Sequence, residues 1–153
     1  MTALAIRETQ SLEAALREVH ATLAELLVAA DEQYAAVAER DRDRIETVTR
    51  KQEQLSARLV RAEQQRLTIL GDRSLSEVAA DHADVDELRS VIATSVAELK
   101  RRQSQTTRLL TRTIDLTRQT LDFIQRVVTV ASPVYGSRGV GMAPQSLLVD
   151  SRA

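Results

Sequence analysis

The sequence contains no cysteine and no long apolar run, and both absences exclude whole classes of protein. Without cysteine the chain has neither disulfides nor a thiol nucleophile, which is compatible with a reducing cytosol. No apolar run approaches the ~20 residues of a membrane span. Arg7 and Glu8 stand where a signal peptide would place its apolar core. We therefore expect a soluble, cytosolic protein without membrane insertion or a cleaved signal.

Glycine, proline and aromatic residues are also scarce, which removes most signals for turns and β-structure. The 153 residues include four glycines, two prolines, two tyrosines and one phenylalanine. Good helix formers dominate instead, chiefly alanine, leucine, glutamate, arginine and glutamine. The composition predicts an all-α protein, and the length fits one domain of ordinary size.

The charge distribution gives little support for nucleic-acid binding. The formal net charge is −1, whereas proteins that bind nucleic acid by neutralising phosphates are usually basic. Residues 71–98 carry two basic and seven acidic side chains, and residues 100–126 carry seven basic and two acidic ones. The basic segment lacks the series of stacking aromatic residues found in single-strand binders. We interpret it as a solvated helix face, and a nucleic-acid adaptor is the weaker alternative.

Residue patterns typical of catalysis and metal binding are missing as well. Neither His20 nor His82 follows a glutamate at the Glu-x-x-His spacing of a di-iron bundle. The glycines at 136, 139 and 141 have no preceding strand and no following Lys-Ser/Thr, unlike a phosphate-binding loop. A Gly-x-Ser-x-Gly nucleophile is also absent. We therefore expect no enzyme activity, no metal and no cofactor, and interpret the chain as a binding protein.

Apolar residues recur at heptad-like spacing through the first part of the chain. They predict a helix from about Thr2 to Glu39, with one stutter near Tyr34. We expect Tyr34 at the edge of the core with its hydroxyl in water. The predicted buried side consists of Leu12, Leu16, Val19, Leu23, Leu26, Ala30, Tyr34 and Val37.

A charged run over residues 39–44 interrupts this repeat and predicts the first turn. Its aspartates can cap a second helix from about Arg44 to Leu70, in which Gln52 is in line with the apolar residues. Gly71 is expected to end this helix, because glycine accepts the left-handed conformation common at helix C-termini. Ser74 and Glu77 then have the spacing of a capping box, which predicts a short helix between residues 71 and 83.

A third long helix is predicted to open at Asp84 and Glu87, which also have capping-box spacing, and to continue to about Ala131. At ~1.5 Å per residue its roughly 48 residues would reach about 70 Å, longer than either earlier helix can cover. Pro133 ends it. We predict an antiparallel bundle of three long helices and a short fourth one in residues 1–131, followed by a flexible tail in residues 132–153.

The third helix ends in an apolar run that is wider than one seam of a bundle requires. Its members form two stripes offset by one position, or about 100° around a helix. The first stripe consists of Leu110, Ile114, Leu121, Ile124 and Val128. The second stripe consists of Leu109, Leu116, Phe123, Val127 and Val130. We expect one stripe to face the protein's own bundle and the other to need another helix, a second copy or a client protein.

Three blocks of residues resemble FlgN, the family of flagellar type III export chaperones for hook-filament junction proteins. The first block is Leu26-Leu27, followed by Asp31-Glu32 and the charged turn. The second recurs at helical spacing and consists of Lys51, Leu55, Leu59, Glu63 and Arg66. The third is the apolar run followed by Tyr135-Gly136 and a tail that closes with Leu148-Val149-Asp150. The resemblance covers nearly the whole chain.

The resemblance implies a cytosolic chaperone that binds C-terminal helical segments of FlgK-like and FlgL-like proteins and delivers them to the export gate. It places an amphipathic client helix on the apolar run, and the implied client-binding residues are Leu109, Leu110, Leu116, Phe123, Val127 and Val130. Tyr135, with Gly136, is implied to dock the complex on an FlhA-type gate protein. The rival interpretation is a structural coiled-coil protein that self-associates through its second stripe and has no client, and a homodimer without client stays open.

Overall fold

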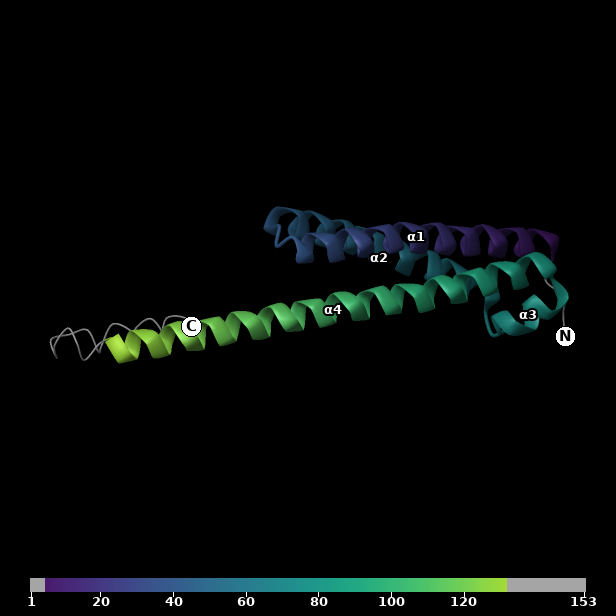
Figure 1. Cartoon of the computed structure of the whole chain (residues 1–153). Coiled ribbons are helices and arrows are strands. Elements are labelled where there is room, and N and C mark those ends of the chain that lie inside the picture. Colours follow the sequence, from purple (N-terminus) through teal and green to yellow (C-terminus); the bar gives the residue numbers. More distant parts are fainter. Residues whose placement is uncertain (1–4, 132–153) are drawn as a thin grey trace. The chain divides into compact units, whose positions relative to one another are not determined.

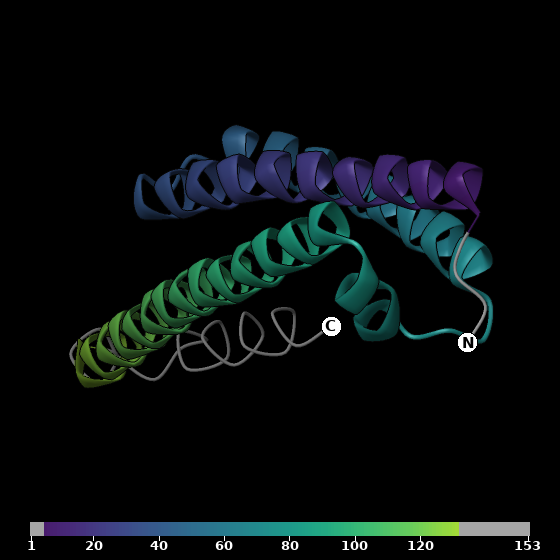
Figure 2. The same ribbon diagram turned by 90° about the vertical axis from the view of Figure 1, so that its right-hand side faces the viewer.

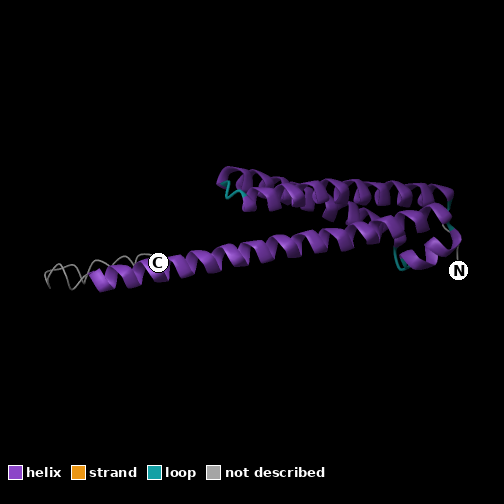
Figure 3. Cartoon of the chain, in the orientation of Figure 1, coloured by secondary structure: helices purple, strands orange, loops and turns teal. Residues whose placement is uncertain are grey.

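The computed structural model describes residues 5–131, which form four helices joined by short loops (Figures 1 and 3). The helices are α1 (Ile6–Ala38), α2 (Arg42–Leu70), α3 (Leu75–Asp81) and α4 (Ala83–Ala131). The all-α prediction is confirmed for the described residues, as are three long helices and a short fourth one. The predicted tail of residues 132–153 lies outside the described residues, so the domain boundary at residue 131 stays a prediction.

The chain divides into two compact units after Leu109, and each is described by itself. The first unit contains α1, α2, α3 and the part of α4 up to Leu109. The described part of the second unit is the segment of α4 from Leu110 to Ala131. None of the helices in residues 5–131 combines the length and apolar composition needed to cross a membrane.

In the first unit, α1 and α2 lie side by side as an antiparallel hairpin (Figures 1 and 2). Ion pairs between the helices record this direction, because higher positions in α1 meet lower positions in α2. Arg58 pairs with both Glu18 and Glu25, and Lys51 Nζ lies 3.7 Å from Glu32 Oε2. The hydrogen bond from Arg58 lowers the pKa of the Glu18 carboxyl below its ordinary value. Exposed ion pairs contribute little to stability. These pairs therefore show which parts of α1 and α2 lie together rather than what holds the two helices together.

The loop between α1 and α2 confirms the predicted charged turn. Arg40 adopts a positive φ of 56°, an uncommon conformation for a residue other than glycine. Asp41 caps α2, because its side chain accepts a hydrogen bond of 3.1 Å from the backbone N–H of Arg44. At the other end of α2, Gly71 has a φ of 59° and provides the predicted C-cap.

Two buried clusters form the core of the first unit. One joins the start of α1 to the end of α2, to α3 and to the start of α4, and consists of Leu12, Leu16, Leu70, Val78, Ala79 and Val85. The other joins the middle of α1 to α2 and consists of Val19, Leu23, Leu26, Ala29, Val48, Leu55 and Ala62. Ile92 of α4 packs against both clusters, and Val96 and Leu99 pack against the second. The segment of α4 up to Leu109 therefore runs parallel to α1, which gives an up–down–up arrangement of long helices.

The apolar repeat of α1 differs from the prediction at one position. Tyr34 is 45 % exposed and does not belong to the core. Gln33 takes the inward place instead, and its Oε1 accepts a hydrogen bond of 3.2 Å from Gln52 Nε2 of α2. Ala30, Gln33 and Val37 continue the spacing of three and four without interruption. The predicted stutter is therefore wrong, because a polar residue with a polar partner occupies the heptad position.

The short helix α3 has the predicted capping box. Ser74 Oγ accepts a hydrogen bond of 3.2 Å from the backbone N–H of Glu77, and the Glu77 carboxylate accepts one from Ser74 N. The predicted capping box of the next helix is wrong, because α4 begins at Ala83 and already contains Asp84 in its first turn. A carboxylate in that turn still interacts favourably with the helix dipole.

Arg102 links the part of α4 in the first unit to α1. Its Nη1 donates to the backbone carbonyl of Leu27 at 3.0 Å and to Asp31 Oδ2 at 2.8 Å. Its Nε donates to Glu98 Oε1 at 2.9 Å, which orients the guanidinium. Hydrogen bonds from Arg101 and then Arg102 lower the pKa of Glu98 from 4.5 to about 2.

We expect Glu98 to make stability depend on pH in the acid range. Its folded pKa of about 2 lies below the ordinary value of 4.5, so its contribution is complete above pH 4.5 and is lost as the pH falls towards 2. Thermal unfolding of Glu98→Gln, followed by circular dichroism, should therefore change less over this window than that of the wild type. Equal pH dependence of the two proteins would contradict a stabilising role for the charged form of Glu98. Asp86→Asn serves as the control, because Asp86 lies on the same helix and pairs with one arginine, Arg89, whereas Glu98 pairs with two.

Candidate functional site

The segment of α4 from Leu110 to residue 129 is an exposed amphipathic helix without a buried side chain. Phe123 is 64 % exposed and Leu116 56 %, and in the other stripe Ile114, Leu121, Ile124 and Val128 are exposed as well. The expectation that one stripe faces the protein's own bundle concerns a contact between the two units and stays a prediction. Both stripes present apolar side chains at the surface.

The predicted site residues differ in their exposure, in the unit to which they belong and in whether the structure describes them. Leu110, Leu116, Phe123 and Val127 are exposed and lie in the second unit. Leu109 is only half-buried and is the last residue of the first unit. The side chain of Val130 and the predicted docking residues Tyr135 and Gly136 lie outside the described residues. The four exposed residues are therefore the part of the predicted site that the structure brings together on one helix surface.

Three threonines lie between the two stripes and were missed as part of this surface. At about 100° per residue, Thr113, Thr117 and Thr120 fall between the directions of Leu116 and Leu121. Thr117 Oγ1 donates to the Thr113 carbonyl at 2.8 Å, and Thr120 Oγ1 donates to the Leu116 carbonyl at 2.9 Å. Because each of these two hydroxyls hydrogen-bonds to its own helix, its methyl group is free to contribute to an apolar surface.

The two stripes and the threonines between them therefore form one surface within residues 110–128. We call this surface the apolar face. By the same angular count it covers about half of the helix circumference. The spacing of the three threonines in the sequence already places them between the two stripes. They belong to an apolar surface only if threonine is counted as partly apolar.

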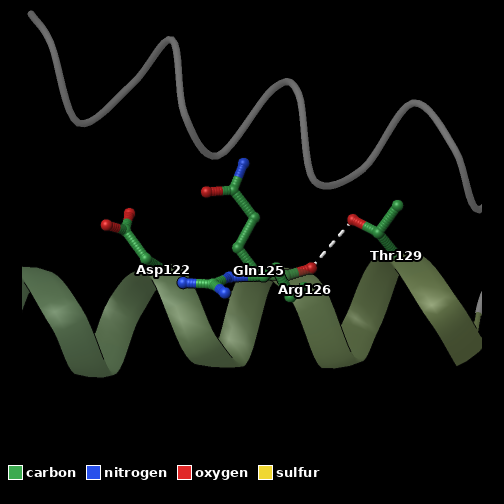
Figure 4. Close-up of a pocket in the computed structure, with 4 residues that line it drawn as sticks. All are labelled: Asp122, Gln125, Arg126 and Thr129. Atoms are coloured by element: carbon green, nitrogen blue, oxygen red, sulfur yellow. Dashed lines mark hydrogen bonds between the residues drawn. The ribbon is translucent and has the colours of Figure 1, made fainter.

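The opposite side of this segment is polar. Figure 4 shows Asp122, Gln125, Arg126 and Thr129 on this side, with Thr129 Oγ1 donating to the Gln125 carbonyl at 2.8 Å. Asp115 lies on the same side by helical position. Polar and apolar residues are thus separated around the helix, which is the pattern of a surface that packs against a partner rather than of a freely solvated helix.

Across residues 5–131, no group of three or more His, Cys, Asp or Glu side chains could hold a metal ion. In the same part of the chain, His20 Nδ1 is buried without a hydrogen-bond partner. A large exposed apolar surface, by contrast, is typical of sites that bind proteins or peptides.

Comparison with known proteins agrees with this assignment to a binding protein. The model of one protein family, described as FlgN protein, matches residues 1–140. Searches of curated proteins and of solved structures found no significant match. The family match spans all four helices and the apolar face. The chain therefore belongs to the FlgN family of flagellar export chaperones.

Proposed function

We propose that this chain binds the C-terminal helical segments of FlgK-like and FlgL-like junction proteins in the cytoplasm and delivers them to the export gate. Membership of the FlgN family supports a flagellar export role. The observation that carries the choice of site is the exposed apolar face of α4, from Leu110 to Val128. A client segment that is amphipathic and helical would bury its own apolar side there, in a helix-on-helix mode.

Delivery limits how tightly the client can bind. A chaperone that releases its client at the gate needs a complex that dissociates readily, so we expect a micromolar Kd, about −8 kcal/mol. The same contact keeps the client unassembled, because its terminal helix is occupied until release. An exposed surface without buried anchor residues suits this moderate affinity.

Sedimentation velocity with and without a C-terminal peptide of a FlgK-like protein tests the proposal. A chaperone should form a one-to-one complex with the peptide. The rival, a self-associating coiled-coil protein, predicts a concentration-dependent dimer that ignores the peptide. Failure of both FlgK-like and FlgL-like peptides to bind would overturn the proposed function.

Tyr135 is proposed to dock the loaded chaperone on an FlhA-type gate protein, on the strength of the family resemblance. Tyr135→Ala should leave client affinity unchanged and weaken binding to the cytosolic part of the gate protein at least about fivefold, the loss of a hot-spot contact worth over ~1 kcal/mol. Calorimetry measures both affinities.

The chain offers a matched control, because Tyr34 is its other tyrosine and is exposed on α1. Tyr34→Ala should leave both affinities unchanged. Equal loss of client and gate binding in Tyr135→Ala would remove Tyr135 from a specific docking role.

A further inference from the structure

Exposed arginines border the apolar face on both of its edges. Counted at about 100° per residue, Arg112 lies beside the stripe of Leu116 and Phe123, and Arg118 lies beyond the other stripe. Both arginines are exposed, and neither forms an ion pair with another described residue. Any partner helix on the apolar face would therefore meet unpaired positive charge at its flanks.

The acidic residues of the same segment lie elsewhere on the helix. Asp115 and Asp122 point away from the apolar face by helical position, on the polar side that Figure 4 shows for Asp122. They are therefore not placed to neutralise a partner's basic residues. Each edge that a partner would touch carries one arginine, and charge complementarity selects a partner whose own edges carry Asp and Glu.

The width of the apolar face indicates how many helices it can hold. One helix packed against another typically occupies a stripe of about 100°, whereas this face covers about half of the circumference. A helix buries so wide an arc when two neighbours pack against it, as in a three-helix bundle. The offset of the two stripes matches two neighbouring contact lines rather than one.

We propose that the apolar face binds two acidic amphipathic helices of the client, one on each stripe, with carboxylates opposite Arg112 on one edge and Arg118 on the other. The proposal rests on the proposed function and specifies the client's chemistry. Residues 110–129 then supply one helix of a three-helix bundle and the client supplies two. A single client helix would leave one stripe exposed to water.

An anionic membrane is the competing partner for a helix with basic edges, and the face itself argues against it. Helices that lie in a membrane interface carry large apolar and aromatic residues opposite a basic polar side. Here Phe123 is the only aromatic residue of the face, threonines occupy its middle, and the polar side contains Asp115 and Asp122. These features favour packing against helices, where small side chains allow close approach.

Charge reversal at the two edges tests the partner's charge. Arg112→Glu and Arg118→Glu should each weaken binding of the client's complete C-terminal helical region, by about three- to tenfold at low salt, the range expected for exposed charge pairs turned repulsive. Raising NaCl from about 50 to about 500 mM should weaken client binding by the wild type, because it screens the attraction, and should strengthen client binding by the variant that carries both substitutions, because it screens the repulsion. Arg17→Glu on α1 is the matched control, since its side chain is exposed and the charge change is identical.

Single substitutions in the two stripes test the number of client helices. Ile114→Asp and Leu116→Asp introduce the same charge at exposed positions in different stripes. Both should weaken binding at least tenfold, while circular dichroism shows unchanged helix content. A loss confined to one of them means a single client helix and overturns the proposal.

Two further results would also overturn it while leaving the proposed function intact. If both arginine variants bound the client normally, the client helices would not carry acidic residues opposite these arginines. If the protein bound phosphatidylserine-containing vesicles and the arginine variants did not, the apolar face would be a membrane-binding surface. If the wild type binds no client at all, the proposed function itself fails, so the two failures are distinguishable.

Discussion

Client binding is expected to be lost when Leu116 and Phe123 are both replaced by aspartate, while the helices stay folded. The two side chains are 56 % and 64 % exposed, so their replacement removes no core contact. In the complex, the same substitutions place two unpaired carboxylates in an apolar interface, where each desolvated charge costs several kcal/mol. A loss of about 4 kcal/mol from about −8 kcal/mol already moves a micromolar Kd to about 1 mM.

Isothermal titration calorimetry with the client peptide measures this loss, and circular dichroism confirms that the variant is helical. The chain supplies a matched control on α2, where Val60 and Leu67 are exposed one heptad apart. The double variant Val60→Asp, Leu67→Asp carries the same added charge on a different helix and should bind normally. Retained binding by the folded Leu116→Asp, Phe123→Asp variant would place the client elsewhere.

The sequence predicts the helices well because their signals are local. Gly71, Asp41 and the Ser74–Glu77 capping box act within a few residues of themselves, and each appears in the structure as predicted. The apolar repeat of α1 likewise requires only the spacing of its own residues. Helix starts and ends therefore followed from short segments, with Asp84 as an exception because the helix begins one residue earlier.

Tertiary features were predicted less completely, since they depend on residues far apart in the sequence. The apolar repeat did not place Gln33 on the inward side of α1, because its hydrogen-bond partner Gln52 lies nineteen positions later on another helix. The hydrogen bonds of Arg102 to Leu27 and Asp31 join helices across more than seventy positions. Spacing alone cannot identify such partners, because many polar residues are available on each helix.

The candidate site likewise has features that follow from local spacing and features that depend on the tertiary structure. Local spacing alone predicts the two apolar stripes, and Leu116 and Phe123 are exposed on that part of α4. Whether a neighbouring helix covers a stripe is a tertiary question, which spacing cannot answer. The threonines between the stripes were overlooked because their hydroxyl groups count as polar until Thr117 and Thr120 are seen bonded to their own helix.

Leu23→Ala is expected to lower the free energy of unfolding by ~2 to 5 kcal/mol, the range for truncating a buried leucine. Leu23 is 2 % exposed and lies in the second core cluster with Val19, Leu26 and Val48. The cavity left by the truncated side chain would lie between α1 and α2 near the middle of the hairpin. Urea denaturation followed by circular dichroism measures the change, and a negligible effect would refute the register of α1.

Val28→Ala provides the control for this substitution, because Val28 lies on the same helix and is 55 % exposed. It should change stability by no more than ~0.5 kcal/mol. At a temperature where Leu23→Ala is still folded, the variant should bind client with wild-type affinity, since Leu23 is buried in the core of the first unit and is not part of the apolar face. Core and face variants then have opposite effects: one loses stability and keeps binding, and the other keeps stability and loses binding. Loss of both properties in both variants would mean that the apolar face belongs to the protein's own folding rather than to a client.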